Sequence, residues 1–227
     1  MRFDIAALFP EIVNAVLSES IIGRGVKSGA IEIYTHQIRD YAYNKHRRVD
    51  DSPYGGGMGM VMQCEPIYRC FVETTEGLPY RPRVIYMSPQ GAVLTQAKAA
   101  ELAKEKGLFI LCGHYEGVDQ RILDKIVDEE ISIGDYVLTG GELPACVLAD
   151  TVARLVPGVL PESEAYEIES FYGGLLEFPQ YTKPEIWEGE KVPQVLLSGH
   201  HKNIENWRLE QAKEVTARKR PDLLNQK

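Results

Sequence analysis

The fold is decided by the stretch Leu108-Phe109-Ile110-Leu111-Cys112-Gly113-His114-Tyr115-Glu116-Gly117. Its first half is a short apolar run, which is typical of a β-strand. Its second half is a loop that contains glycine, aromatic and polar residues. In open α/β sheets, ligands bind in the crevice beyond the carboxyl ends of the strands. A strand that runs directly into such a loop therefore predicts an α/β protein with a ligand site at this strand end.

Two further junctions of the same kind flank this stretch along the chain. They are Tyr86-Met87-Ser88-Pro89-Gln90-Gly91 and Ile133-Gly134-Asp135-Tyr136-Val137-Leu138-Thr139-Gly140-Gly141-Glu142. Glycines let the backbone approach a flat ligand, and its N–H and C=O groups can read an adenine edge and ribose hydroxyls. Each loop taken singly also fits an ordinary tight turn. Three such loops in succession favour one shared pocket.

Alternating strand-like and helical runs over about the first 155 residues predict an α/β sheet. The predicted strands span residues 3–8, 31–35, 84–87, 108–111 and 130–133. Helices are predicted after Pro66, after the capping residue Thr95, and over residues 143–155. No Gly-x-Gly-x-x-Gly follows the first strand and no Gly-x-x-x-x-Gly-Lys-Ser/Thr occurs, so a nucleoside ligand would bind by another architecture.

Composition excludes several classes of protein. The net charge of −8 over 227 residues argues against a protein that coats nucleic acid indiscriminately. No apolar run approaches the roughly 20 residues of a membrane span, and no signal peptide is evident, so we expect a soluble cytoplasmic protein. The cysteines form no Cys-x-x-Cys pair, which predicts reduced thiols and no metal site.

Basic charge is concentrated in two segments. Residues 198–227 carry 7 Lys and Arg against 4 Asp and Glu, or +3, so the remainder carries 18 against 29, or −11. The second basic segment spans residues 39–48. Both segments fit ordinary solvated faces as well as surfaces that contact a phosphate backbone. An acidic stretch over residues 161–170 precedes a helix predicted over 204–218, which predicts a linker and a small basic helical domain.

These motifs resemble the TrmD-type tRNA (guanine-N1)-methyltransferases of the SPOUT superfamily. The resemblance is carried by residues 50–60, 88–91, 112–121, 133–142, 170–171, 174–177, 179–184, 195–201 and 207–208. It implies a parallel-sheet SPOUT domain over 1–160, whose segment from about 85 to 145 forms a deep trefoil knot that binds S-adenosylmethionine. It also implies a linker over 161–175 and a C-terminal helical tRNA-binding domain over 176–227. Patterning alone predicts an unknotted sheet, because knots are nearly absent from proteins.

The resemblance assigns roles to individual residues by motif. The implied contacts to S-adenosylmethionine are Tyr86, Met87, Ser88, Pro89, Gly113, Glu116, Ile133, Gly134, Asp135, Tyr136, Val137, Leu138, Gly140, Gly141 and Pro144. Together with the basic segments, it gives the predicted tRNA contacts His46, Arg47, Arg48, Ser170, Lys183, His201, Arg208 and Lys213. It further implies a homodimer with active sites at the subunit interface. A dependence on Mg²⁺ is implied by the resemblance only, since no ligand set is evident.

The implied reaction is methyl transfer to N1 of the guanine at tRNA position 37, 3′ of the anticodon. A base must remove the N1 proton, and an arginine can stabilise the charge that develops on O6. The arginine position is Arg154, and the base position, an aspartate in the family, holds Glu169. Glu169 also fits one more solvated acid of the linker. Other departures from the family pattern are Leu160-Pro161-Glu162 in place of Gly-Asn, Lys183 for Arg, and His200 for Asn.

Two other functions fit the same residues. A SPOUT methyltransferase with a different RNA target would methylate transcripts that lack a guanine 3′ of the anticodon. A noncatalytic RNA-binding protein would keep the pocket as a nucleoside sensor and would transfer no labelled methyl group to any RNA. The intact pocket motifs together with Arg154 favour an enzyme.

Overall fold

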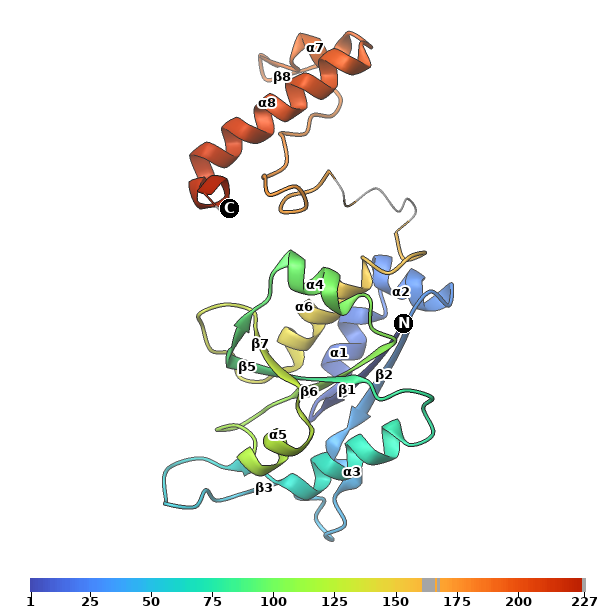
Figure 1. Ribbon diagram of the computed structural model, residues 1–227, viewed down its shortest axis with the longest axis vertical. Helices are drawn as coiled ribbons and strands as arrows, with labels where there is room; N and C mark the ends of the chain where they lie inside the picture. Colours follow the sequence, from blue (N-terminus) through green and yellow to red (C-terminus); the bar gives the residue numbers. More distant parts are fainter. Residues whose placement is uncertain (161–165, 167, 226–227) are drawn as a thin grey trace. The chain divides into compact units, whose positions relative to one another are not determined.

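The chain divides into two compact units, Met1–Ser163 and Glu164–Lys227. The computed structural model describes residues 1–160, 166 and 168–225 (Figure 1). Three acids of the predicted linker, Glu162, Glu164 and Glu167, lie outside the described residues. The prediction of an exposed linker there stays a prediction.

The first unit is built on one five-stranded parallel sheet with strand order β2-β1-β6-β5-β7 (Figure 1). The strands are β1 (Arg2–Ala7), β2 (Glu32–Gln37), β5 (Arg83–Val93), β6 (Gly107–Cys112) and β7 (Glu129–Ser132). The helical segments are α1 (Pro10–Leu17), α2 (Ser20–Lys27), η1 (Ile38–Tyr41), α3 (Cys64–Thr75), α4 (Gln96–Leu102), α5 (Gln120–Ile126) and α6 (Glu142–Ala153). A small antiparallel ribbon pairs β3 (Asp50–Asp51) with β4 (Val61–Met62). All five predicted strands are present, and the α/β fold is confirmed.

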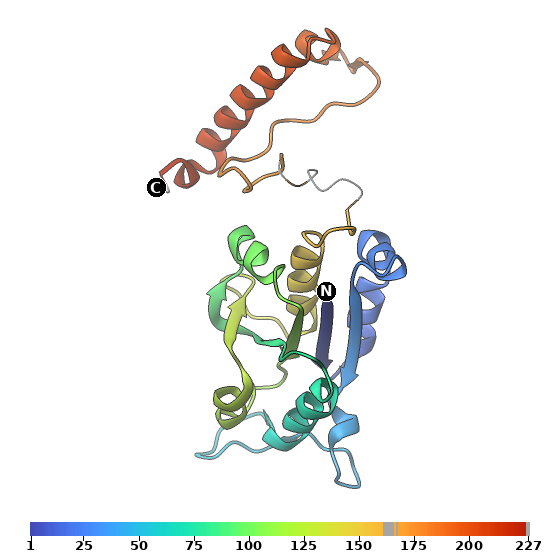
Figure 2. The same cartoon turned by 45° about the vertical axis from the view of Figure 1, so that its right-hand side comes forward.

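Helices cover both faces of this sheet (Figure 2). Successive side chains of a strand point to opposite faces, so each central strand contributes to two hydrophobic clusters. Ile5 and Ile110 pack with α1, α4 and α6 on one face. Phe109 and Leu111 pack with α3 and α5 on the other face. The strand β6, which lies in the middle of the sheet, is buried along its whole length.

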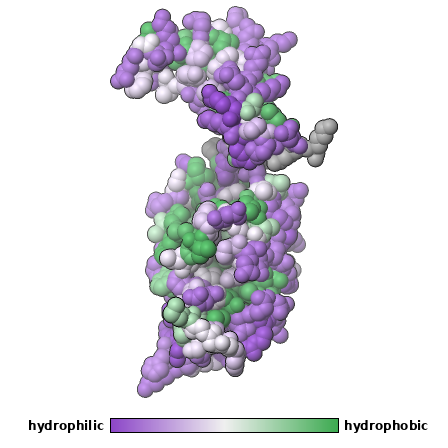
Figure 3. All heavy atoms as spheres, turned by 90° about the vertical axis from the view of Figure 1, so that its left-hand side faces the viewer, coloured by the Kyte–Doolittle hydropathy of each residue, from purple (hydrophilic) through white to green (hydrophobic). Residues whose placement is uncertain are grey.

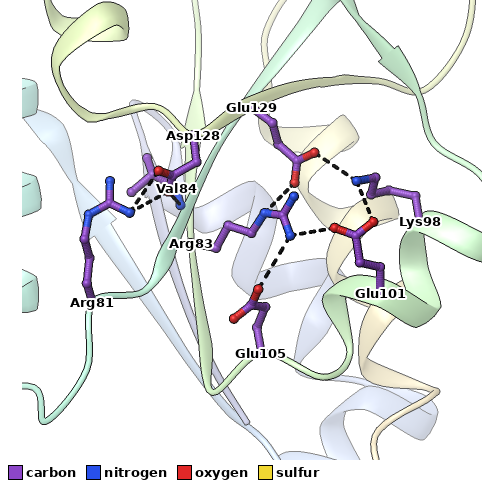
Figure 4. Close-up of polar contacts among 8 residues, drawn as sticks. All are labelled: Arg81, Arg83, Val84, Lys98, Glu101, Glu105, Asp128 and Glu129. Carbon is purple, nitrogen blue, oxygen red and sulfur yellow. Dashed lines mark hydrogen bonds and ion pairs between the residues drawn. The ribbon is translucent and has the colours of Figure 1, made fainter.

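An ionic network ties α4 to the amino-terminal ends of β5 and β7 (Figure 4). The Arg83 guanidinium lies 2.6 Å from Glu101 Oε1 and 2.8 Å from Glu129 Oε1. The Lys98 ammonium lies 2.8 Å from Glu101 Oε2 and 3.2 Å from Glu129 Oε2. Thr95 accepts a hydrogen bond from the Lys98 N–H at 3.2 Å, which confirms the predicted cap of α4. The network holds α4 against the sheet directly after β5.

The second unit contains the long helix α8 (His201–Lys219). It also contains the hairpin β8 (Ile186–Trp187) and β9 (Glu190–Lys191), helix α7 (Gln194–Leu197) and the 3-10 turn η2 (Pro221–Asn225). Thr216 of α8 is fully buried, and its hydroxyl accepts a hydrogen bond from the Leu176 N–H at 2.8 Å. The ring centroids of Trp207 and Tyr181 lie 6.3 Å apart. The helix predicted over 204–218 is therefore present and begins three residues earlier, at His201.

Candidate functional site

The three glycine-containing loops line one cavity of about 380 Å³ at the carboxyl ends of β5, β6 and β7. Its volume falls within the range of roughly 300–1,000 Å³ that small-molecule sites occupy. All the predicted cofactor contacts line this cavity except Asp135 and Tyr136. Tyr136 folds back over its own loop, where its hydroxyl donates a hydrogen bond to the Ile133 carbonyl at 3.3 Å.

The first loop is a bulge within β5. Met87 and Ala92 both pair with Ile131 of β7, so residues 88–91 project from the ladder. The Ser88 hydroxyl accepts a hydrogen bond from the Gln90 N–H at 3.1 Å, which fixes the turn. At Gly91 a Cβ atom would collide with the Glu130 backbone, so only glycine fits this close approach.

The second and third loops are joined backbone to backbone. The Gly141 N–H donates a hydrogen bond to the Gly113 carbonyl at 2.8 Å, and His114 forms an antiparallel bridge with Gly140. A Cβ atom at Gly141 would lie 2.7 Å from the Cα of Cys112. The absence of a side chain at Gly141 therefore lets α6 begin directly against the end of β6.

The cavity wall contains apolar and polar residues, and its charged residues are acidic. Glu116 and Glu130 line it, and no lysine or arginine of residues 1–160 does. Burial raises the pKa of Tyr86 to about 12, so this wall residue keeps its proton at neutral pH. Phosphate groups are usually bound by arginine, lysine or clustered backbone N–H groups, whereas a carboxylate wall favours a cation. The two carboxylates therefore suit a ligand that carries positive charge.

Several wall residues are not identified by the sequence motifs as contacts. Among them are Val61, Gln90, His114, Tyr115, Glu130 and Thr139. His114 and Tyr115 belong to the stretch that decides the fold, and their place between two predicted contacts is the signal that could have identified them. Val61 belongs to β4, and Met62 beside it pairs with Val118. The chain that follows the glycines of residues 55–59 therefore reaches the cavity wall.

The two predicted catalytic residues belong to different units. Arg154 is the C-cap residue of α6 in the first unit. Glu169 lies in a compact turn of the second unit, where the Phe171 N–H donates a hydrogen bond to the Leu175 carbonyl at 2.8 Å. Ser170, a predicted tRNA contact, accepts a hydrogen bond from the Glu177 N–H at 3.0 Å.

The remaining predicted tRNA contacts are exposed on the two units. His46, Arg47 and Arg48 occupy the loop between η1 and β3, which Asn44 closes by accepting a hydrogen bond from the Arg48 N–H at 2.8 Å. On the second unit, the exposed residues are Lys183, His201, Arg208 and Lys213. The Arg208 guanidinium stacks 4.8 Å from the centroid of the Phe178 ring.

Neither a metal centre nor a membrane span is present among the described residues. They contain no group of three His, Cys, Asp or Glu side chains that could hold a metal ion, so the implied magnesium ion has no ligand cluster there. None of their helices is long and apolar enough to cross a membrane.

Fold and cavity together define a class: a parallel α/β protein with a ligand-sized cavity at the carboxyl ends of its strands and no dinucleotide or P-loop motif. A family model described as tRNA (Guanine-1)-methyltransferase TrmD matches residues 1–226, and the chain belongs to this family.

Relatives named tRNA (guanine-N(1)-)-methyltransferase match along nearly their whole length. One from Ruminiclostridium cellulolyticum is 58% identical over 99% of this chain and 97% of its own. One from Lachnospira eligens is 56% identical over 98% of this chain and 94% of its own. One from Clostridioides difficile is 52% identical over 98% of this chain and 97% of its own.

Proposed function

We propose that this protein transfers a methyl group from S-adenosylmethionine to N1 of the guanine 3′ of the anticodon in tRNA, at position 37. The products are N1-methylguanosine and S-adenosylhomocysteine. Family membership and the names of its relatives support the reaction. The structural observation that carries it is the cavity wall, which contains Glu116 and Glu130 and no lysine or arginine of residues 1–160.

Different residues of the cavity wall contact different parts of the ligand in this proposal. S-adenosylmethionine, when bound, supplies a methyl group on a positively charged sulfonium. Tyr86, Ile133 and Leu138 offer apolar contacts to the adenosine part. Glu116 and Glu130 offer negative charge to the cationic part. No step is assigned to a metal ion.

Glu169 and Arg154 act on the guanine in this proposal. N1 of neutral guanine carries a proton and is a poor nucleophile until that proton leaves. The Glu169 carboxylate accepts the proton, and the Arg154 guanidinium stabilises the negative charge that moves to O6. N1 then takes the methyl group, and positioning of the two substrates supplies much of the acceleration. Glutamate is one methylene longer than the aspartate of the family pattern.

We also propose a homodimer that forms through α1 and α6, which pack against each other. Ile12 and Val16 stand one turn apart on α1 and are 42% and 49% exposed. Leu143 and Val147 are likewise one turn apart on α6 and are 52% and 44% exposed. Apolar patches also interrupt the polar surface of the first unit in Figure 3. Exposed apolar stripes on adjacent helices are typical of a protein interface. In the dimer, the linker and second unit of one subunit complete the active site of its partner.

The trefoil knot of the family is proposed for residues 85–145. Contacts between the second and third loops support it. The His114–Gly140 bridge and the hydrogen bond from Gly141 to Gly113 hold the chain before α6 against the end of β6. Such a close approach of two loops is what threading one through the other requires.

Methylation of defined transcripts tests the function. We expect a tRNA transcript with guanine 3′ of the anticodon to gain one methyl group at that nucleotide, mapped by mass spectrometry of nuclease fragments. A transcript with adenine at the same position should gain none. Methylation elsewhere in both transcripts would assign a different RNA target. No transfer to any RNA would leave a noncatalytic nucleoside sensor.

A further inference from the structure

A buried carboxylate stands directly behind the cavity wall. Glu142, in the first turn of α6, is 3% exposed and does not line the cavity. Its Oε1 atom has no hydrogen-bond partner among residues 1–160, 166 and 168–225. The positive end of the α6 dipole favours the charge, but a buried carboxylate that lacks a donor is unfavourable. A hydrogen-bond donor beside Glu142 would stabilise this carboxylate.

An imidazole that lacks an acceptor lies close to this carboxylate. His114 lines the cavity, and its Nδ1 atom is buried without a hydrogen-bond partner in the described part of the chain. Nδ1 lies 3.9 Å from Glu142 Oε2, the other oxygen of the same carboxylate. A relative shift of about 1 Å would bring the two atoms to hydrogen-bond distance. The His114 ring is held by Phe9 and Tyr115, with ring centroids 5.3 Å and 5.0 Å away.

Gly140 has no side chain, which leaves room for Glu142 and His114 to approach each other. A Cβ atom at Gly140 would lie 2.5 Å from Glu142 Oε2 and 2.6 Å from His114 Nδ1. Since His114 and Gly140 also form a backbone bridge, the two side chains meet at the seam between the second and third loops. A hydrogen bond between Glu142 and His114 would therefore hold the second loop against the third.

We propose that Glu142 is a positioning residue that holds the proton of the His114 imidazole on Nδ1. A carboxylate beside one ring nitrogen fixes the tautomer of a histidine and leaves the other nitrogen as an acceptor. His114 Nε2 then accepts a hydrogen bond from a hydroxyl or ammonium group of the bound nucleoside. This role rests on the proposed function of the cavity, that it binds S-adenosylmethionine. The pair makes the wall selective for ligands with a donor group at that point.

The tautomer of His114 is the direct readout. Nitrogen-15 NMR of the full chain distinguishes protonated from unprotonated ring nitrogens, and the His114 signals are assigned by their loss in His114→Phe. We expect the proton on Nδ1 in the wild type and on Nε2 in Glu142→Leu. A purely structural role for Glu142 would leave the tautomer unchanged. An Nε2 proton in the wild type would overturn the proposal.

A double-mutant cycle on S-adenosylmethionine affinity gives the functional readout. We expect Glu142→Leu and His114→Phe each to weaken binding about 10-fold, and the double variant to lose about as much as His114→Phe alone. The phenyl ring keeps the packing against Phe9 and Tyr115 and removes both nitrogens. The proposal would be overturned if the loss of affinity in the double variant equals the product of the two single losses. It would also be overturned if neither single variant loses affinity. If Glu142→Leu does not fold, Glu142→Gln replaces it in the cycle, with the same non-additivity expected.

A second carboxylate–histidine pair serves as the matched control. His36 Nε2 lies 2.9 Å from Asp4 Oδ1, and neither residue lines the cavity. We expect His36→Phe to lower stability and leave S-adenosylmethionine affinity unchanged. A wild-type protein that binds no S-adenosylmethionine would refute the proposed function. The tautomer measurement would still decide the Glu142–His114 pair, so the two failures are distinguishable.

Discussion

Glu169 and Arg154 face different chemical demands in the proposed reaction. Glu169 has to accept a proton, so its carboxylate must reach N1 of the guanine in its ionised form. Arg154 keeps its charge throughout, because the guanidinium does not lose its proton in proteins. Its place at the C-cap of α6, a largely buried helix, gives it a rigid support. Glu169 gains a fixed backbone from the turn that Phe171 and Leu175 close.

Replacing Glu169 with glutamine removes the proposed base and keeps its size. We expect Glu169→Gln to slow single-turnover methylation by about 10²- to 10⁴-fold, the usual contribution of a general base. Affinity for S-adenosylmethionine should not change, because the residues that line the cavity all belong to the first unit and Glu169 belongs to the second. Glu188→Gln, in the β8–β9 hairpin, is the control and should react at the wild-type rate. Near-normal chemistry in Glu169→Gln would remove Glu169 from the role.

Residue types in the loops can be interpreted from the sequence, but their contacts across the fold cannot. Glycine clusters identify the three loops. They do not show that Gly141 packs on Cys112, because that approach depends on how α6 meets β6. For the same reason, no motif indicates that Glu142 and His114 lie on either side of Gly140. A glycine in the sequence indicates conformational freedom at its own position. The residues that it contacts in space depend on the tertiary structure and cannot be predicted from the motif.

At the scale of elements, short apolar runs located all five strands of the main sheet. Strand β5 extends beyond its predicted end because Ala92 and Val93 resume the ladder after the bulge. Helix α1 was not predicted, since Pro10 ends an apolar run and also fits a first helical turn. Helix α2 contains two glycines, which disfavour a helix in isolation. Gly25 packs closely on Val159, so tertiary contact outweighs propensity there.

Hydrogen bonds to Asp4 predict how stability depends on pH. The one from His36 joins β2 to β1, and those from Arg2 lie within β1. Burial alone would raise the pKa of the Asp4 carboxyl, but hydrogen bonds from His36 and Arg2 lower it below its ordinary 3.8. Ionised Asp4 therefore stabilises the fold above pH 3.8, and this stabilisation is lost as the pH falls from there toward the lower folded pKa. Urea unfolding across this window should show a steeper loss for wild type than for Asp4→Asn.

The control for this measurement is Asp124→Asn, which removes an exposed carboxyl of α5. Its urea midpoints should follow those of the wild type at every pH. Parallel curves for wild type and Asp4→Asn would contradict a stabilising role for the buried carboxylate.

At the scale of the whole molecule, the sequence predicted a sheet domain followed by a small basic one. The chain divides into two compact units after Ser163. The predicted bounds of the sheet domain at 160 and of the linker over 161–175 stay a prediction. Composition shifts reveal such a division because each unit needs its own core. Hydrophobic periodicity predicts helices and strands, but it does not indicate which segment passes through which. The knot and the dimer were therefore expected from the family resemblance alone.

A charge placed on the α1–α6 face tests the dimer. We expect Val147→Glu to give a monomer in sedimentation velocity at micromolar concentration, because an unpaired carboxylate buried in an apolar interface is strongly unfavourable. Val26→Glu makes the same change on α2, where the residue is 38% exposed, and should stay dimeric. Methylation should fall in Val147→Glu, since each active site of the proposed dimer needs both subunits. A dimeric Val147→Glu would place the interface elsewhere.

Charge reversal on α8 tests the tRNA surface. We expect Lys213→Glu to weaken tRNA binding about 10-fold and to lower the salt dependence of binding by about one unit of slope for each phosphate that is no longer neutralised. Lys104→Glu, a charge reversal on the first unit, should bind tRNA like the wild type. Neither variant should alter S-adenosylmethionine affinity. Unchanged tRNA affinity in Lys213→Glu would exclude this face of α8.

Calorimetric titration of S-adenosylmethionine into wild type, Gly141→Ala and Gly173→Ala tests most directly whether the three loops form one binding site. The extra methyl group at Gly141 has no room against Cys112, whereas a Cβ at Gly173 meets no atom within 4 Å. The wild type and Gly173→Ala should each bind one molecule per chain with equal affinity, and Gly141→Ala should bind at least about 10-fold more weakly. A wild type that gives no binding heat, or a Gly141→Ala variant that binds as tightly as the wild type, would contradict the site.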